Sequence, residues 1–497
     1  MSQESGVQGP EPEESEAFAE HSSEGSRLAT DDSAAKPPYH MPFDEFRRHG
    51  HQVVDWVADY LENVGERPIT PDVEPGDIRA LLPESAPEQP EPFENVMRDL
   101  DEIIMPGITH WQSPGWFGFF PANSSPPSIL GELVSAGLST QGMMWSTSPA
   151  ATELESVVAD WLVDLLGLPE IWKTTGPGGG VIQMSASDST HLAFVVARER
   201  VEGPAESKVL YASNQSHSSI EKGAKIAGFK QVRLIGIDDE YALDAAELRR
   251  TIVNDLAAGL IPTAVVSNVG TTGTTAVDPV RSIGEIAREY GLWHHVDAAY
   301  AGTAMICGEF RHYQDGLELA DSYTFNPHKW MFTNFDCNLF YVADRKPLID
   351  TMSILPPYLR DEASESGQVI NYRDWHVPLG RRFRALKLWF VIRSYGAEGI
   401  RYHVREHHRL ATDLAARVER HSSLELIAPT PFGLVSFRHV DGDGATNALA
   451  TAINQSGWAH VSPSTIEDRR FVRVSIGQTY TTAEHVDRLW DLIQSSA

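Results

Sequence analysis

The sequence predicts an α/β protein with a mainly parallel sheet, preceded by a helical segment and followed by a small α+β domain. The first observation is that strand-like apolar runs alternate with stretches of helical periodicity between residues 208 and 342. The second is that reactive polar residues directly follow several of these runs, where the carboxyl ends of parallel strands meet. The third is a length of 497 residues with 41% hydrophobic content, which suffices for a large core and two or three domains.

Composition and charge exclude several classes of protein. The formal net charge of −29 argues against nucleic acid as a partner, because phosphate backbones are bound through clustered lysine and arginine. The two cysteines, Cys307 and Cys337, imply neither a disulfide framework nor a metal site, and they favour a reducing compartment. No apolar run approaches the ~20 residues of a membrane helix, and the N-terminus lacks a signal-peptide pattern. We therefore expect a cytoplasmic protein without membrane partners.

The first 120 residues are expected to form no core of their own. Residues 1–38 are rich in Glu, Ser, Pro and Gly, which predicts a disordered acidic tail. Residues 39–120 contain apolar residues at helical spacing from Phe43 to Val64 and a second helix expected over Phe93–Ile104. Because prolines break the chain between these helices, we expect them to pack on another subunit as a helical dimerisation segment.

The stretch from Ile108 to Ser125 is unusually aromatic, with tryptophan and phenylalanine set among proline and glycine. Such loops form flat apolar walls. These walls occur in hydrophobic cores and in substrate pockets alike, because aromatic side chains dominate both settings. On composition alone both interpretations remain open.

A large domain is expected over residues 121–395. It begins with helices predicted over Pro126–Leu138 and Ala151–Leu166, and a helix predicted over Thr190–Val201 follows the serine-rich segment Ser185–Ser189. A helix start with unpaired backbone N–H groups and nearby hydroxyls suits a phosphate, although serine is also an ordinary N-cap. The segment is therefore a candidate phosphate site.

The sheet of this domain is predicted from six strand-like runs, with helices expected over Asp244–Ala257 and Val280–Tyr290. The runs are Lys208–Ser213, Gln231–Ile237, Thr263–Asn268, Trp293–Val296, Ser322–Phe325 and Asn338–Val342. Because ligands bind at the carboxyl ends of parallel strands, the residues that follow these runs are the candidate site residues.

Three of those residues have complementary chemistry: Lys329, Asp297 and His217. A lysine amine is inert toward carbonyls while protonated, but burial and a nearby cation lower its pKa and allow a Schiff base. The set suits pyridoxal 5'-phosphate, since the lysine binds the aldehyde, the acid keeps the pyridine nitrogen protonated and the imidazole stacks on the ring.

Long motifs also occur in a fixed order along the chain. They are His110-Trp111-Gln112-Ser113-Pro114, Ser148-Pro149-Ala150-Ala151-Thr152-Glu153-Leu154-Glu155, His295-Val296-Asp297-Ala298-Ala299-Tyr300-Ala301-Gly302, Asn326-Pro327-His328-Lys329-Trp330 and Pro378-Leu379-Gly380-Arg381-Arg382-Phe383-Arg384. From about Pro42 to Leu492 the chain resembles the pyridoxal-phosphate-dependent aromatic-L-amino-acid decarboxylase family, the group II decarboxylases. The resemblance implies an aspartate-aminotransferase-like fold and a homodimer with its active site at the subunit interface.

The resemblance implies roles for individual residues. Lys329, Tyr358 and His217 are implied to be catalytic, with Tyr358 returning a proton to the substrate carbon. The residues implied to contact the cofactor are Lys329, Asp297, His217, Ala186, Ser187, Thr272, Ala299, Asn326 and His328. The residues implied to contact the substrate are Trp111, Phe119, Gln141, Met143 and Gly380. Gln141 and Met143 are implied to reach into the partner's pocket, and both depart from the family's apolar and aromatic residues, which leaves the preferred substrate open.

The remaining residues, 396–497, show helix, strands and helix, which predicts the small C-terminal domain. His403 and His407 fall at i and i+4 beside His408, a spacing that resembles a metal site. Because no HExxH pattern is present, we expect a solvated helix face there and no metal.

We expect the protein to decarboxylate an aromatic L-amino acid to the corresponding amine through a Schiff base at Lys329. Relatives that lack the equivalent of His217 or Tyr358 are typically aldehyde synthases, so the presence of both favours decarboxylation, and Gly380 resembles enzymes for aromatic substrates. The alternatives are an oxygen-dependent aromatic aldehyde synthase, a decarboxylase of a non-aromatic amino acid, and a non-catalytic pyridoxal phosphate or amino-acid binding protein.

Overall fold

The computed structural model describes residues 39–354 and 369–497. The predicted acidic tail, residues 1–38, and the predicted catalytic Tyr358 lie outside the described residues. Among the residues that are described, no helix combines the length and the apolar character needed to cross a lipid bilayer.

The chain divides into two compact units between Trp56 and Val57, inside the first helix, α1 (Phe43–Asn63). The first unit contains the start of α1, whose Phe43 side chain is 85% exposed. The second unit contains α2 (Asp77–Leu81), α3 (Phe93–Asp99), both sheets and the candidate site. Helix α3 continues into a π-helical turn over Leu100–Ile104, so the helix predicted over Phe93–Ile104 is present.

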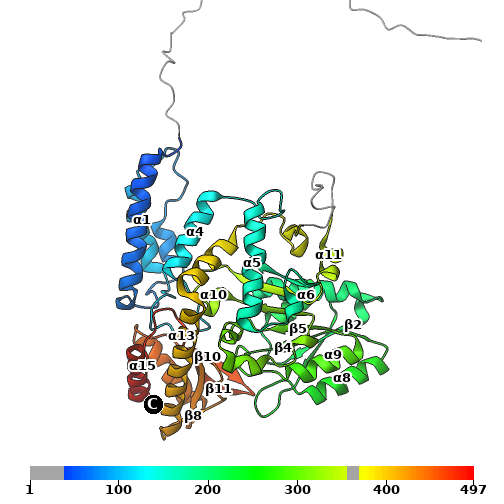
Figure 1. The fold of residues 1–497 in the computed structure, drawn as a ribbon. Helices are drawn as coiled ribbons and strands as arrows, with labels where there is room; N and C mark the ends of the chain where they lie inside the picture. The colour runs from blue at the N-terminus through cyan, green and yellow to red at the C-terminus, as the bar shows by residue number, and fades with distance from the viewer. Residues whose placement is uncertain (1–38, 355–368) are drawn as a thin grey trace, which may run out of the picture. The chain divides into compact units, whose positions relative to one another are not determined.

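A seven-stranded sheet forms the centre of the second unit (Figure 1). Its strand order is β1-β7-β6-β5-β4-β2-β3, in which the pairs among β2 to β6 are parallel and β7 is antiparallel to both of its neighbours. The strands are β1 (Gly179–Gln183), β2 (Lys208–Ser213), β3 (Gln231–Ile235), β4 (Ile261–Asn268), β5 (Trp293–Asp297), β6 (Ser322–Phe325) and β7 (Asn338–Val342). The predicted α/β fold with a mainly parallel sheet is confirmed.

Helices cover both faces of this sheet, because alternate strand residues point in opposite directions. Leu210 and Ala212 pack against one set of helices, whereas Val209 and Tyr211 pack against another. The first set is α6 (Ala186–Arg200) and α7 (Ser219–Ile226), and the second is α8 (Ala245–Ala257) and α9 (Val280–Tyr290), which run side by side in Figure 1. The other helices of this region are α4 (Pro126–Leu138), α5 (Pro149–Leu166), α10 (Pro327–Trp330) and α11 (Lys346–Met352).

Parallel pairing aligns the carboxyl ends of β4, β5 and β6. Asn268, at the end of β4, is in register with Asp297 at the end of β5, and Asp297 is in register with Thr324 of β6. The segments that follow these strands therefore meet at one edge of the sheet, where ligands bind in folds of this kind.

A four-stranded antiparallel sheet, of order β10-β11-β9-β8, lies near the C-terminus. Its core includes Phe117 of the aromatic stretch, which is fully buried, while the neighbouring Trp116 forms a β-bridge with His460. Part of the aromatic stretch is therefore core. The elements are α13 (Arg384–Arg420, broken at Gly396, φ 63°), β8 (Leu424–Leu426), β9 (Leu434–His439), α14 (Asp443–Gln455), β10 (Ser462–Ile466), β11 (Arg469–Ser475) and α15 (Ala483–Ser496).

The prediction that the histidines of α13 form a solvated helix face is wrong for His407. This residue is buried, and its Nδ1 accepts a hydrogen bond from Trp330 Nε1 at 2.9 Å. Burial lowers the pKa of His407 to about 3, so its imidazole is neutral at neutral pH. His407 therefore holds the residue next to Lys329 in place.

Candidate active site

A cavity of about 200 Å³ lies at the carboxyl edge of β4, β5 and β6. Every residue predicted to contact the cofactor lines it, although these residues come from distant parts of the chain. They are Ala186, Ser187, His217, Thr272, Asp297, Ala299, Asn326, His328 and Lys329. The remaining lining residues are Phe120, Ser185, Ser219, Asn268, Gly270, Thr271 and Tyr300.

Lys329 is held on the short helix α10 by contacts at both ends of that helix. At its start, the Asn326 N–H donates to Ala299 O at 3.0 Å, and Asn326 Oδ1 accepts from Asn338 Nδ2 at 2.9 Å. At its end, Trp330 is fully buried and stacks on Tyr300, with ring centroids 4.7 Å apart. The backbone of the lysine is therefore fixed, and its side chain lines the cavity.

The surroundings of Lys329 favour its neutral form. Burial lowers the pKa of Lys329 below its ordinary value; Asp297 opposes this shift, and Arg473 adds to it. The lysine Nζ lies 5.3 Å from the centroid of the Phe120 ring. A larger neutral fraction at neutral pH makes the amine a better nucleophile toward a carbonyl group.

Asp297 is a buried carboxylate with one oxygen left unpaired by the protein. Its Oδ1 accepts the Ala299 N–H at 2.9 Å. No described residue donates a hydrogen bond to its Oδ2, and no described cationic side chain lies within ion-pair distance. Because a buried carboxylate is costly without a charged or hydrogen-bonding partner, Asp297 fits a ligand that brings a protonated ring nitrogen.

His217 lies in the turn between β2 and α7, and Ser219 fixes its tautomer. The Ser219 N–H donates to His217 Nδ1 at 3.2 Å, and the Ser219 hydroxyl lies 2.8 Å from the same nitrogen. The proton of the neutral ring is therefore on Nε2. Desolvation lowers the pKa of His217; Asp297 opposes this shift, and Lys329 adds to it. A neutral imidazole lining the cavity is suited to stack on a flat ring.

Helix α6 begins at the cavity with Ala186, earlier than the predicted start at Thr190. Ser185 is its N-cap, because the Ser185 Oγ accepts the Asp188 N–H at 3.3 Å and donates to the Asp188 carboxylate at 2.8 Å. The N–H groups of a first helical turn have no partner within the helix, so those of Ala186 and Ser187 suit an anion. With the unpaired acid and the lysine, this donor set fits pyridoxal 5'-phosphate.

Of the two adjacent phenylalanines in the aromatic stretch, Phe120 lies beside the lysine, whereas the predicted Phe119 does not line the cavity. The Phe120 ring stacks on Tyr300 with centroids 3.9 Å apart. Phe119 is 53% exposed and stacks on Trp111 at 5.5 Å. The aromatic stretch marks this region in the sequence, but the backbone conformation decides which ring faces Lys329.

Arg473 of β11, which belongs to the small C-terminal sheet, lies beside Phe120 without lining the cavity, and the sequence did not predict this position. The residue is 5% exposed, its Cζ lies 5.1 Å from the Phe120 centroid, and its Nε donates to Gly273 O at 3.2 Å. Its Nη2 is buried without a hydrogen-bond partner among the described residues. Burial lowers the pKa of Arg473 to about 10, so the guanidinium is still charged at neutral pH. Nothing in its local sequence distinguishes it from an ordinary strand residue.

The other predicted substrate contacts, Trp111, Gln141, Met143 and Gly380, do not line the Lys329 cavity either. Gln141 Oε1 accepts the Arg381 N–H at 3.2 Å, which places Gln141 beside the Gly380 loop. Within one chain, these four predicted substrate contacts therefore lie outside the cavity that the predicted cofactor contacts line.

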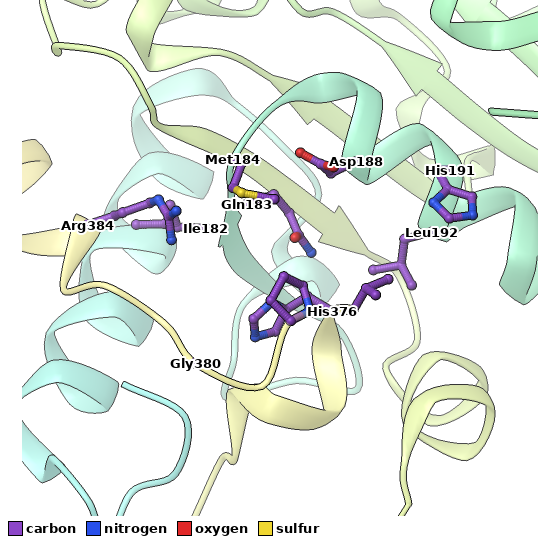
Figure 2. Close-up of a pocket in the computed structure, with 11 residues that line it drawn as sticks. Ile182, Gln183, Met184, Asp188, His191, Leu192, His376, Gly380 and Arg384 are labelled. Carbon is purple, nitrogen blue, oxygen red and sulfur yellow. The ribbon is translucent and has the colours of Figure 1, made fainter. Parts of the chain in front are cut away.

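Gly380 lines a second cavity of about 210 Å³, shown in Figure 2. In this view Asp188 and His191 project from α6, while His376 and Gly380 lie on the loop that faces them. The first residues of α6 line the Lys329 cavity and the next ones line this cavity, so the start of one helix separates the two.

A sequence model described as the pyridoxal-dependent decarboxylase conserved domain matches residues 75–440. Phenylacetaldehyde synthase of Arabidopsis thaliana is 43% identical over 473 residues, covering 92% of this chain and 96% of that protein. Aromatic-L-amino-acid decarboxylase of Bos taurus is 43% identical over 472 residues, covering 92% and 97%. The crystal structure of Oryza sativa TDC with PLP and tryptamine matches with a TM-score of 0.90 at 36% identity, covering 93% of this chain and 99% of that one.

Proposed function

The chain belongs to the pyridoxal-dependent decarboxylase family, and from this premise we propose that it converts an aromatic L-amino acid to the corresponding amine. Its cofactor is pyridoxal 5'-phosphate. When bound, this cofactor withdraws the electron pair that departing carbon dioxide leaves on the substrate. The observation that carries the proposal is the convergence of Lys329, Asp297 and His217 on one cavity.

In this proposal five of the lining residues act on four parts of the cofactor. Lys329 binds the aldehyde through its neutral amine, and the unpaired oxygen of Asp297 keeps the ring nitrogen protonated. The first-turn amides of Ala186 and Ser187 bind the phosphate at the positive end of α6. His217 would stack on the ring face, and its Nε2 proton, left free because Nδ1 accepts from Ser219, would be available to the substrate.

Arg473 is the residue that we assign to the substrate carboxylate. A buried guanidinium with an unpaired Nη2 is a strong partner for a carboxylate. Arg473 and Lys329 contact the same Phe120 ring, at 5.1 and 5.3 Å, so a carboxylate bound by the arginine is held near the lysine. Holding the carboxylate in one orientation selects which bond of the substrate breaks.

Because the predicted substrate contacts Gln141, Met143 and Gly380 lie outside the Lys329 cavity of their own chain, we propose a homodimer in which they complete the partner's site. Apolar side chains are available for such an interface, since Leu130 and Leu133 of α4 are exposed in the single chain. Tyr358 remains the proposed proton donor to the substrate carbon. We also propose a cytoplasmic location.

An oxygen-dependent aldehyde synthase is the second candidate, because a relative of 43% identity is named phenylacetaldehyde synthase. Simple decarboxylation is favoured by the resemblance, through His217 and Tyr358. A decarboxylase of an acidic or diamino acid is less consistent with the aromatic wall, where Trp111 packs against Trp116 with the rings tilted by 37° and stacks on Phe119.

Product analysis tests the proposal. Protein loaded with pyridoxal 5'-phosphate is incubated with tryptophan, 5-hydroxytryptophan, phenylalanine, tyrosine or DOPA, and mass spectrometry is combined with a hydrogen peroxide assay. Amine with little peroxide supports decarboxylation, aldehyde with stoichiometric peroxide supports the synthase, and no product from any of them overturns both. Lys329→Ala is the control, and undiminished turnover by this variant would refute the proposed role of the lysine.

A further inference from the structure

Asn268 ends β4 and lines the Lys329 cavity, where it is buried. Its position is in register with Asp297 on the adjacent parallel strand. Its Nδ2 donates to Ser216 Oγ at 2.9 Å and to Asp278 Oδ2 at 2.8 Å. An amide nitrogen carries two hydrogens, so the donor capacity of this side chain is used up.

Asp278 fixes the orientation of the Asn268 amide. The Asp278 carboxylate is buried and also accepts the backbone N–H groups of Asn268 at 2.7 Å and of Leu243 at 2.8 Å. Burial raises the pKa of Asp278 to about 6, against the effect of these donors, so the group is mainly ionised at neutral pH. A flipped amide would place its oxygen against this carboxylate, which repels it.

The Oδ1 of Asn268 is consequently left for a ligand. No described residue donates a hydrogen bond to it, and the neighbouring Asp297 also has an unpartnered oxygen. Because buried acceptors are usually hydrogen-bonded, Asn268 Oδ1 and the unpartnered Asp297 oxygen, at neighbouring strand ends, suit a ligand that supplies a hydrogen-bond donor. We propose that Asn268 Oδ1 is a second acceptor, beside Asp297, for the protonated ring nitrogen of pyridoxal 5'-phosphate.

This inference rests on the proposed attachment of the cofactor to Lys329. It also explains why an amide suits this position. An amide donates to Asp278 and Ser216 while it accepts from the ligand, whereas aspartate would add a second negative charge beside Asp297 and leucine would offer no acceptor.

The test compares the affinity of full-length apoprotein for two compounds that differ only in the ring nitrogen. These are pyridoxal 5'-phosphate and 1-deazapyridoxal 5'-phosphate, whose binding is followed by absorbance. In Asn268→Leu we expect Kd for the first to rise by roughly 10- to 150-fold, the range for a lost hydrogen bond to a charged group. We expect Kd for the deaza compound to change by less than about threefold, since it has no ring N–H to lose. Ser216→Ala, which leaves Oδ1 in place, should change both affinities by the same small factor.

Equal losses of affinity for the two compounds would show that Asn268 only maintains local structure, and unchanged affinities would show that it does not contact the cofactor. Either result overturns the inference. Failure of the proposed function gives a different result, because wild-type protein would then show the same absorbance as Lys329→Ala on addition of pyridoxal 5'-phosphate. If Asn268→Leu does not fold, Asn268→Ser, which retains a donor for Asp278, replaces it with the same expected selectivity.

Discussion

Replacing Arg473 by methionine is expected to reduce catalysis strongly while leaving the stability of the fold almost unchanged. The arginine is buried, yet no described carboxylate pairs with it and its Nη2 has no hydrogen-bond partner among the described residues. Such a charge contributes little to folding, because its desolvation is not compensated within the protein. Its contribution appears when a substrate carboxylate binds.

The contacts of Arg473 give the expected changes in kcat/KM and in the stability of the fold. A lost charge-assisted hydrogen bond to the substrate costs about 1.5–3 kcal/mol, which corresponds to a roughly 10- to 150-fold fall in kcat/KM. In the fold, methionine loses the contact with the Phe120 ring and the hydrogen bond to Gly273 O, at about 1 kcal/mol each. It also removes Nη2, whose burial without a hydrogen-bond partner destabilises the wild-type fold by about 1–3 kcal/mol. Because these terms nearly cancel, Tm should shift by no more than about 2 °C.

Steady-state kinetics and calorimetry on the cofactor-loaded variant check both halves of this prediction. Arg473→Lys keeps the charge and should retain more activity than Arg473→Met. Arg281→Met, which removes a surface ion pair with Asp315, is the matched control and should leave kcat/KM unchanged. A fall in Tm of more than about 5 °C that accompanies the fall in kcat/KM would show a structural role for Arg473. An unchanged kcat/KM would show that the carboxylate binds elsewhere.

Two further predictions concern the fold. The contribution of the buried neutral histidines to thermal stability should be fully present above about pH 6.5. It should decrease as the pH falls toward 4, because the unfolded chain then binds protons that these histidines do not. The histidines whose pKa is lowered to about 3, chiefly by burial, are His294, His295, His328, His376 and His407. A Tm that stays constant between pH 7 and 4 in a calorimeter would contradict this reasoning. Glu155→Ala leaves buried Arg381 without the carboxylate that contacts it at 2.5 Å, and should cost about 3–5 kcal/mol in urea unfolding. Glu155→Gln should cost less, and a loss below about 1 kcal/mol in the alanine variant would show that Arg381 finds another partner.

Local patterns in the sequence were sufficient for the architecture and for the convergence of Lys329, Asp297 and His217 on one edge of the sheet. Strand character and turn residues depend on neighbours in the chain, so the strands Lys208–Ser213 and Ser322–Phe325 have the bounds that the sequence predicted. Once a parallel sheet is predicted, the residues that follow its strands must meet at one edge, and Asp297, Lys329 and His217 do line one cavity. Helix α6 was placed too late, because a serine-rich start resembles a loop until its cap is seen.

Only the tertiary structure determined which side chains from distant elements pack beside the residues at this edge of the sheet. Arg473 belongs to a strand of another sheet, and His407 is buried because Trp330 packs against it, which helical spacing does not reveal. The choice between Phe119 and Phe120 depends on the local backbone path, with Phe119 at φ 54°. Sequence periodicity records which residues are apolar and how they repeat along one element. It does not record which distant element covers them, because that is determined by packing across the whole unit.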